Sequence, residues 1–357
     1  GVQTCALPIC KWLIALGIKI FGNHEFGWRI AVAVAGAATI YLTSRIALWI
    51  FHERKWALLA AILMTLDGLN LVMSRTALLD IFLTLFILLA VNSWLKGKYP
   101  SFAIYLGLAM GSKWSAIYYV AIFLLLDLFI NRKLLRTFKV GLTSLFVYLI
   151  SWFGWFHSNL GWDRDAKSNP ILSLLYYHKE MLNFHTSLTE KHTYQANPWS
   201  WLVMGRPTSF YYQSPKGCGV KDCAKEVLAI GTPILWWLGA IAVLFLIGIN
   251  LHNLAMREFD SAAVIPMLGI IAGYLPWFFF QKRTVFTFYA IVFEPFLILA
   301  LVLMAKMAYE YDERFKYLIG ISVLVIAVNF IDFYPLFTGM TLTYKDWYSH
   351  MWWSSWI

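Results

Sequence analysis

The chain has 357 residues, of which 60% are hydrophobic and 13% are charged, and its formal net charge is +10. Soluble domains carry about 25% charged residues, so this composition excludes an ordinary soluble domain and predicts a polytopic protein embedded in the lipid bilayer. In such a protein an excess of Lys and Arg over Asp and Glu indicates loops that face anionic lipid. We therefore expect no nucleic-acid partner.

The first ten residues, "GVQTCALPIC", lack a charged segment, and their apolar stretch is too short for a signal peptide. We interpret residues 1–10, which include Cys5 and Cys10, as a non-native leader. The expected order after it is N-terminal membrane helices over 11–156, an outer loop over 157–230, C-terminal membrane helices over 231–340 and an outer tail over 341–357.

Apolar runs predict about ten spanning helices, since a helix needs about 20 mostly apolar residues to cross the bilayer. They cover residues 27–50, 56–73, 77–95, 100–112, 114–130, 138–157, 231–250, 261–280, 285–305 and 317–336. The pair 100–112 and 114–130 is interrupted by "GSKWS", so either helix is expected to be short, tilted or broken. The predicted fold is an all-α polytopic membrane protein.

The basic residues of the short connections predict the orientation. Successive spans cross the membrane in opposite directions, so their connections alternate between its two faces. Most of the basic residues then fall on one face: Arg54, Lys55, Lys96, Lys98, Arg132, Lys133, Arg136, Lys139, Arg257, Lys306, Arg314 and Lys316. By the positive-inside rule this face is cytoplasmic, so the loop at 157–230 is expected outside.

Five ionisable residues fall near the outer ends of different apolar runs: Arg29, Arg75, Asp80, Lys113 and Arg283. A charge at the bilayer centre costs about 2.5 to 3.5 kcal/mol, so such residues need a partner, water or a function. Asp80 lies within an apolar helix, and we expect it to form an ion pair with a neighbouring Arg. The alternative is that each Lys or Arg only extends its charged end to the interface.

Cations at the level of the lipid headgroups suit a lipid phosphate whose tail stays in the bilayer. Arg presents a fork of donors and Lys a point charge, so Arg29, Lys113 and Arg283 are expected to hold a phosphodiester. Neutralising that phosphate makes it a better leaving group. A nearby carboxylate would then act as general base toward an acceptor hydroxyl.

The outer loop contains "HKEMLNFHTSLTEKHTYQANPWSWLVMGRPTSFYY", which predicts amphipathic elements on the membrane surface. His178, His185 and His192 recur at a spacing of seven, but no carboxylate lies in register. We therefore expect hydrogen-bonding or surface histidines and no metal centre. Cys218 and Cys223 indicate a local disulfide in an oxidising compartment, with free thiols as the alternative.

Five segments together resemble the protein O-mannosyltransferase family in its bacterial form, from about Lys11 to the C-terminus. They are "SRTALLD", "GLAMGSKWSAIYYV", "HTYQANPWSWLVMGRPTSFYY", "RTVFTFYAIVFEPF" and "MWWSSWI". The resemblance implies the GT-C membrane fold and the transfer of mannose, with inversion, from polyprenyl-phosphate mannose to Ser or Thr hydroxyls of a secreted or translocating polypeptide. It also implies a multi-pass protein of the bacterial plasma membrane with an extracytoplasmic active face.

The resemblance further implies roles for individual residues. The donor phosphate would be contacted by Arg29, Arg75, Lys113, Arg283 and Tyr289. The loop that handles the acceptor and the sugar would present His192, Tyr194, Trp199 and Arg206, and Asp80 would be a supporting carboxylate.

The departure from the family pattern lies at the N-terminus. The family carries its catalytic Asp-Glu pair in the first outer loop, upstream of an "HPPLGK" stretch, and here only "KWLIALGI" from Lys11 onward matches. The catalytic residues are therefore unknown, and we predict that the chain as written is inactive. We also expect about ten of the family's roughly eleven membrane helices.

Two other functions compete with this interpretation. Another GT-C transferase, which moves aminoarabinose or a pentose, would share the phosphate-binding cations but should lack the "HTYQANPWSWLVMGRP" loop. A secondary transporter would place charged or Gly/Pro-broken positions near the membrane midplane in two related halves, and the sequence shows no such repeat.

Overall fold

The computed structural model describes residues 7–158, 161–216 and 218–357. Most of this part is helical. In chain order the longer helices are α1 (Pro8–Phe21), α2 (Glu25–Phe51), α3 (Arg54–Thr65), α5 (Asp80–Leu95), α6 (Tyr99–Ser112), α7 (Ala116–Asn131), α8 (Leu134–Ile150), α10 (Pro170–Ser187), α11 (Pro233–Met256), α12 (Ser261–Tyr274), α13 (Glu294–Tyr311) and α14 (Phe315–Thr338). The short ones are α4 (Gly68–Met73), α9 (Phe153–His157) and α15 (Tyr344–Ser349).

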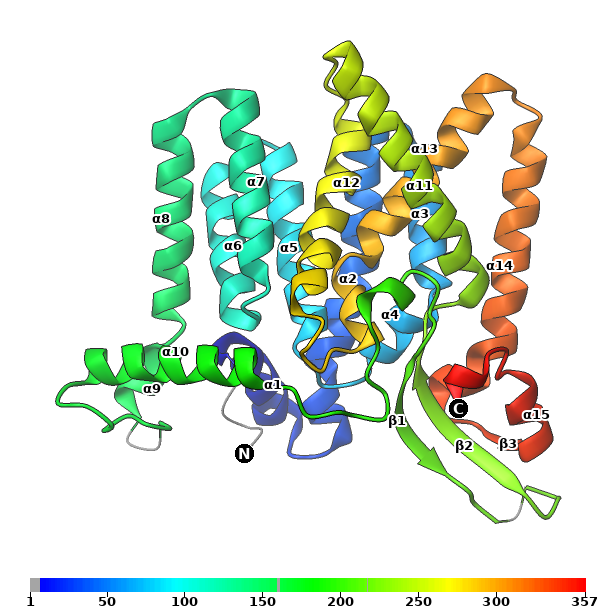
Figure 1. Cartoon of the computed structure of the whole chain (residues 1–357), viewed down its shortest axis with the longest axis horizontal. Helices are drawn as coiled ribbons and strands as arrows, with labels where there is room; N and C mark the ends of the chain where they lie inside the picture. Colours follow the sequence, from blue (N-terminus) through cyan, green and yellow to red (C-terminus); the bar gives the residue numbers. More distant parts are fainter. Residues whose placement is uncertain (1–6, 159–160, 217) are drawn as a thin grey trace.

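Most helices stand roughly side by side and form a broad bundle (Figure 1). Five segments in the described part are long and apolar enough to cross a membrane: Glu25–Phe51, Leu134–His157, Pro233–Met256, Ser261–Phe280 and Phe315–Thr338. Large apolar side chains cover the outward surfaces of these helices, for example Leu142, Leu244 and Leu324, all more than half exposed. Such a surface is stable in lipid, so the chain is a multi-pass membrane protein of predominantly helical fold.

Four of the expected spans are interrupted, and the one over 138–157 breaks at Ser151 and Trp152, between α8 and α9. The span expected over 56–73 breaks at Leu66 and Asp67, where the fully buried Asp67 carboxylate accepts hydrogen bonds from the backbone N–H of Thr232 (2.8 Å) and the indole N–H of Trp236 (3.1 Å). The span at 261–280 ends in the 3-10 segment η3 (Leu275–Phe280), and the span at 285–305 begins with the 3-10 segment η4 (Thr287–Val292). Hydropathy predicts the apolar run but not these breaks, because polar partners distant in sequence stabilise them.

The connections at one end of the bundle form what we call the loop face, which lies at the bottom of Figure 1. It carries α10, α15 and a small sheet in the order β1-β2-β3, with β1 at Thr208–Gln213, β2 at Cys223–Ala229 and β3 at Thr341–Thr343. Both strand pairs are antiparallel. The sheet is an addition to the expected all-helical architecture, and a disulfide between Cys218 and Cys223 lies near the start of β2.

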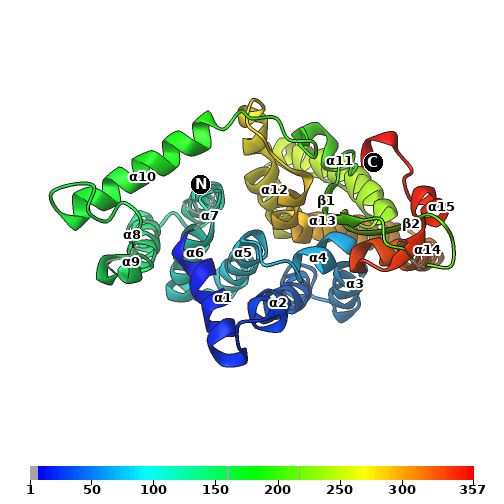
Figure 2. The ribbon, with the colours of Figure 1, turned by 90° about the horizontal axis from the view of Figure 1, so that it is seen from below.

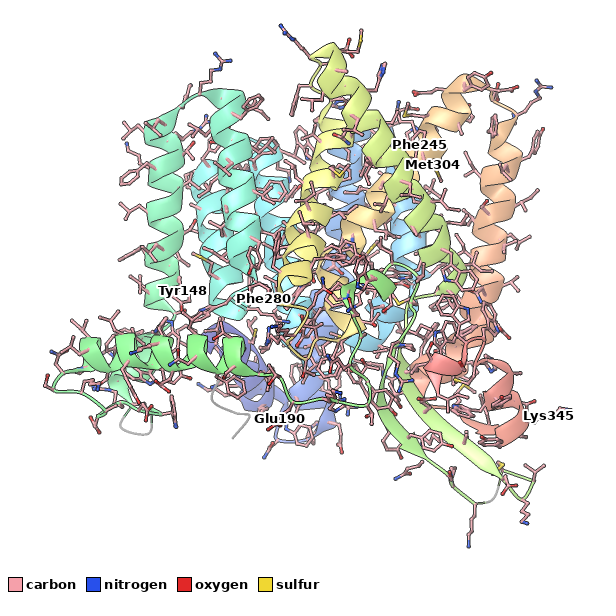
Figure 3. All side chains as sticks on the ribbon, in the orientation of Figure 1. Tyr148, Glu190, Phe245, Phe280, Met304 and Lys345 are labelled. Atoms are coloured by element: carbon pink, nitrogen blue, oxygen red, sulfur yellow. A yellow bond between two sulfur atoms is a disulfide. The ribbon has the colours of Figure 1, made fainter. Side chains whose placement is uncertain are left out.

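Helix α10 lies across the loop face, nearly perpendicular to the bundle, and reaches from α8 toward α12 (Figures 1 and 2). On one side of α10, Leu174, Tyr177 and Met181 pack inward, whereas the apolar Ile171 and Leu175 are exposed. Figure 3 shows Tyr148 at the end of α8 above the middle of α10, and Phe280 near the end of α10 that faces α12. The sequence prediction of amphipathic elements on the membrane surface stays a prediction for this helix.

Helix α1 includes residues that the sequence interpretation assigns to a leader. It begins at Pro8, and Ile9 and Cys10 are buried in the main core. The boundary expected after residue 10 therefore falls inside a packed helix, because Ile9 and Cys10 pack against the bundle as the following turns do. Cys5 lies outside the described residues.

Candidate functional site

The side chain of Lys113 is held beneath the loop face by a carboxylate and an aromatic ring. Lys113 follows the last residue of α6 in extended backbone, with φ −156° and ψ 136°. Its ammonium lies 2.7 Å from Oδ1 of Asp80 and 3.7 Å from the ring centre of Tyr289. Asp80 is the first residue of α5 and is only 4% exposed. The structure thus corrects the expected pairing of Asp80 with an Arg: the partner is Lys113, because the end of α6 lies beside the start of α5.

A small pocket, the inner cavity, surrounds this ion pair. Its volume is about 10 Å³, and it is lined by Asp80, Lys113, Ser115, Tyr119, Ala272, Gly273, Trp277, Tyr289 and Val292. Space of this size accommodates about one water molecule. The inner cavity therefore supports the position of Lys113 and is too small for a sugar.

A larger pocket, the outer cavity, shares Lys113, Ser115 and Trp277 with the inner one. Its volume is about 240 Å³, and it is lined by Lys113, Trp114, Ser115, Ile117, Tyr118, Leu182, His185, Thr186, Trp277, Phe280 and Arg283. Three parts of the chain contribute: the start of α7, the last turns of α10 and the η3 segment with the residues after it. The wall combines cationic and hydroxyl groups with apolar side chains, which is suited to an amphipathic ligand.

Arg283 faces the outer cavity from the segment between η3 and η4. Its Nη2 lies 3.0 Å from Nδ1 of His185. Its guanidinium carbon is 5.9 Å from the ring centre of Trp277, and the Lys113 ammonium is 5.8 Å from the same ring. One buried tryptophan thus lies within cation–π range of both cations, which offsets part of the repulsion between like charges in one pocket.

His185 is uncharged in this environment. Burial is the main cause that lowers the pKa of the His185 imidazole to about 4, and the positive charges of Arg283 and Lys113 lower it further. The Arg283 guanidinium can only donate, so Nδ1 of His185 accepts that hydrogen bond. His185 is therefore a neutral member of a cationic pocket.

A second histidine anchors α10 to the bundle. The Tyr148 hydroxyl lies 2.6 Å from Nε2 of His178, whose Nδ1 bonds the Leu174 carbonyl, and the Trp114 indole N–H donates to the same hydroxyl at 3.0 Å. Because a carbonyl only accepts, Nδ1 of His178 carries the proton and Tyr148 donates to Nε2. The expectation of hydrogen-bonding histidines is confirmed for His178 and His185.

Two of the expected phosphate contacts lie away from the outer cavity. Arg29 is exposed in the first turns of α2, which lies on the opposite side of α5 from α7 (Figure 2). The Arg75 guanidinium donates to the backbone carbonyl of Phe337, at 3.4 Å, near the end of α14. The structure therefore brings together Lys113, Tyr289 and Arg283 of the predicted set, and places Arg29 and Arg75 elsewhere, because similar depth in the membrane does not fix lateral position.

The four predicted loop residues lie near the aromatic segment that carries Tyr289. The His192 ring is 5.2 Å from the Phe286 ring, and Nδ1 of His192 accepts from the backbone N–H of Tyr194. The Arg206 guanidinium donates hydrogen bonds to the backbone carbonyls of Thr193 and Ile357, so it links the loop to the last residues of the chain. Trp199 is 62% exposed, and its ring lies 5.3 Å from that of Phe278 in η3.

Sequence reasoning missed Trp277 and Tyr119 as site residues and assigned His185 no place in the site. Both aromatics lie in apolar runs, where nothing distinguishes them from lipid-facing residues. The sequence does contain a signal that His185 faces inward, because it continues the helical spacing of Leu174, Tyr177 and Met181. It lines the pocket at the end of α10. Only the position of α10 across the bundle brings it to Arg283.

Comparison with known proteins shows the family. Residues 6–155 match the family described as "Dolichyl-phosphate-mannose-protein mannosyltransferase", and residues 171–356 match the "C-terminal four TMM region of protein-O-mannosyltransferase". The polyprenol-phosphate-mannose–protein mannosyltransferase of Corynebacterium glutamicum is 30% identical, over 98% of this chain and 81% of its own length. The protein of that name from Mycobacterium tuberculosis is 29% identical, over 98% and 80%.

Solved structures show the same fold. The Saccharomyces cerevisiae protein O-mannosyltransferase Pmt1-Pmt2 complex bound to the sugar donor aligns with a TM-score of 0.79 at 16% identity, over 99% of this chain and 86% of that one. ArnT from Cupriavidus metallidurans bound to undecaprenyl phosphate aligns with a TM-score of 0.57 at 17% identity, over 85% and 50%. The predicted GT-C fold is thereby confirmed. The chain belongs to the protein O-mannosyltransferase family of membrane glycosyltransferases.

Proposed function

We propose that the outer cavity binds the phosphate of polyprenyl-phosphate mannose, and that this site serves the transfer of mannose to Ser or Thr hydroxyls of a secreted or membrane polypeptide. The prediction that the chain as written is inactive stays beside this proposal, because donor binding needs only the cavity whereas transfer also needs a general base. The loop face would then be the extracytoplasmic face of a bacterial plasma membrane, with the basic connections in the cytoplasm. The donor named here is the one in the printed names of the Corynebacterium and Mycobacterium relatives.

The observation that carries the proposal is the pairing of Lys113 and Arg283 in one pocket. Both cations line the outer cavity, and Ile117, Leu182 and Phe280 supply apolar surface to the same wall. A phosphodiester needs cationic donors, while its polyprenyl tail needs apolar surroundings. The pocket offers both at once.

The same cations suit the reaction. An acceptor hydroxyl attacks the anomeric carbon of mannose and gives its proton to a general base that is not assigned among the described residues. The bond from that carbon to the phosphate oxygen breaks, and its electron pair moves onto the phosphate. Lys113 and Arg283 would stabilise this developing negative charge, which is the largest electrostatic requirement of the step. Inversion at the anomeric carbon follows from a single displacement.

Asp80 has a supporting role in this proposal. Its carboxylate is buried, bonded to Lys113, and absent from the lining of the outer cavity. It therefore orients the ammonium and balances its charge in a region of low dielectric. We assign no general base among the described residues, because no carboxylate of these residues lines the outer cavity.

The proposal is tested by equilibrium binding of polyprenyl-phosphate mannose to the purified chain in lipid nanodiscs. We expect saturable binding that weakens about tenfold or more in Lys113→Met and in Arg283→Met, since loss of one charge-assisted hydrogen bond costs about 1.5 to 3 kcal/mol. Arg54→Met, on an exposed position of the opposite face, is the matched control. The proposal would be refuted if no binding occurred, or if both cavity substitutions left the affinity for polyprenyl-phosphate mannose unchanged.

A further inference from the structure

His185 lines the outer cavity and carries one ring N–H that has no partner within the described residues. It is half-buried in the last turn of α10 and lines the same pocket as Lys113 and Arg283. Its Nδ1 accepts from Nη2 of Arg283 at 3.0 Å, so in the neutral ring the proton resides on Nε2. No hydrogen-bond partner for that Nε2–H occurs within the described residues.

A neutral donor has a specific advantage here. Two cations already share the pocket, and a third positive charge would add repulsion whenever the pocket is empty. A neutral imidazole adds a hydrogen bond to a phosphate oxygen without that repulsion. It also comes from a third part of the chain, α10, so a phosphate held by all three groups would be enclosed from three sides.

We propose that His185 is a third donor-phosphate ligand, whose Nε2–H donates to a phosphate oxygen while Arg283 fixes the ring through Nδ1. This inference rests on the proposed function of the outer cavity. It makes α10 part of the donor site, because the last turn of this helix would contact the phosphate of the lipid. The competing role is purely structural, in which His185 only orients Arg283.

Two substitutions separate these roles because they imitate different nitrogens. In His185→Asn the amide oxygen can replace Nδ1 as the acceptor for Arg283, but nothing replaces the donor at Nε2. In His185→Gln the longer side chain can place an amide N–H near the position of Nε2, but the acceptor for Arg283 is lost. A phosphate ligand predicts that Asn is the more damaging change; an orienting role predicts the reverse.

The measurement is the dissociation constant of polyprenyl phosphate, without sugar, in nanodiscs of uncharged lipid. We expect His185→Asn to bind about tenfold more weakly than wild type, which corresponds to 1.4 kcal/mol, and His185→Gln to lose less than about threefold. His157→Asn is the matched control, because His157 is exposed on α9 and bonds only the carbonyl of its own helix. Thermal unfolding midpoints check that each variant is folded.

Each outcome decides between the proposals. If wild type shows no saturable binding, both the proposed function and the role of His185 are overturned. If wild type binds and Lys113→Met does not, but His185→Asn equals wild type, the function stands and the inference about His185 is wrong. Equal losses in the Asn and Gln variants, or a greater loss in Gln, also contradict direct contact with the phosphate.

Discussion

The ammonium of Lys113 lies 2.7 Å from Oδ1 of Asp80, and the two residues come from different helices. The side chain of Asp80 is 6% exposed and that of Lys113 is 19% exposed, so both charged groups are largely shielded from solvent. An isolated charge at this depth is costly, whereas a pair that is well hydrogen-bonded is tolerated. The pair fixes where the cationic end of Lys113 lies, between the two cavities.

Removing the negative charge should therefore destabilise the fold. In Asp80→Asn the ammonium loses its counter-charge, and breaking a buried pair costs about 3 to 5 kcal/mol. We place the loss of unfolding free energy near the lower end, about 3 kcal/mol, because Lys113 keeps some contact with solvent. Thermal or denaturant unfolding in detergent measures it. The double variant Asp80→Leu with Lys113→Leu should recover much of the loss; an Asp80→Asn protein as stable as wild type would show that the pair is not coupled.

The ring of Tyr289 should contribute through its face. Lys113 lies 3.7 Å from the ring centre, and a partly desolvated cation–π contact contributes about 0.5 to 2 kcal/mol. Tyr289→Phe keeps the ring, so its affinity for polyprenyl-phosphate mannose should stay within about twofold of wild type. Tyr289→Leu should weaken binding about two- to thirtyfold. Equal affinities for the Phe and Leu variants would exclude a role for the ring.

Acid should weaken the fold through the histidines of α10. Burial lowers the pKa of His178, and burial with nearby cations lowers that of His185 to about 4. Between about 6.5 and 4 the unfolded chain binds protons that the folded chain does not, so stability is constant above this window and falls as the pH decreases through it. For the partly exposed His185 we expect a loss of about 1 kcal/mol. Unfolding midpoints measured against pH should fall less steeply in His185→Asn than in wild type; parallel curves would contradict the assignment.

Arg206 should hold the C-terminus on the loop face. Its Nη1 donates to the carbonyl of Ile357 at 2.7 Å and to that of Ser355, and its Nη2 donates to the carbonyl of Thr193 at 2.8 Å. Losing one charged hydrogen bond costs about 1.5 to 3 kcal/mol, so Arg206→Ala should speed carboxypeptidase digestion of the tail about tenfold or more. The control is Arg54→Ala. Unchanged digestion would mean that other contacts retain the tail, such as the indole N–H of Trp356 on the Met204 carbonyl.

The sequence predicted the fold class well because hydropathy is a local signal. Each apolar run from 27–50 to 317–336 contains helix in the structure, and the interruption at "GSKWS" marks the end of α6 and the start of α7. The breaks at Asp67 and before Glu294 were not predicted. Their polar groups find partners from other parts of the chain, as Asp67 does at Thr232 and Trp236, and a single sequence does not reveal such pairings.

The candidate site was only partly predictable, for a related reason. Position along a helix gives depth in the membrane, so Arg29, Arg75, Lys113 and Arg283 were correctly grouped as charges near helix ends. Depth does not give lateral position. Arg75 is bonded to the end of α14, whereas Lys113 and Arg283 meet His185 beneath α10. The missing information was the path of α10 across the bundle (Figure 2).

The central claim, that the lipid-linked donor occupies the outer cavity, is tested most directly by photo-crosslinking. A polyprenyl phosphate with a diazirine on its first isoprene unit would be bound to the chain in nanodiscs, irradiated and mapped by mass spectrometry. We predict crosslinks at the apolar wall of the outer cavity, at Ile117, Tyr118, Leu182 or Phe280, and their loss in Lys113→Met. Crosslinks concentrated instead in the apolar crevice between α3, α13 and α14, around Leu63, Met304 and Ile319, and unchanged by Lys113→Met, would contradict it.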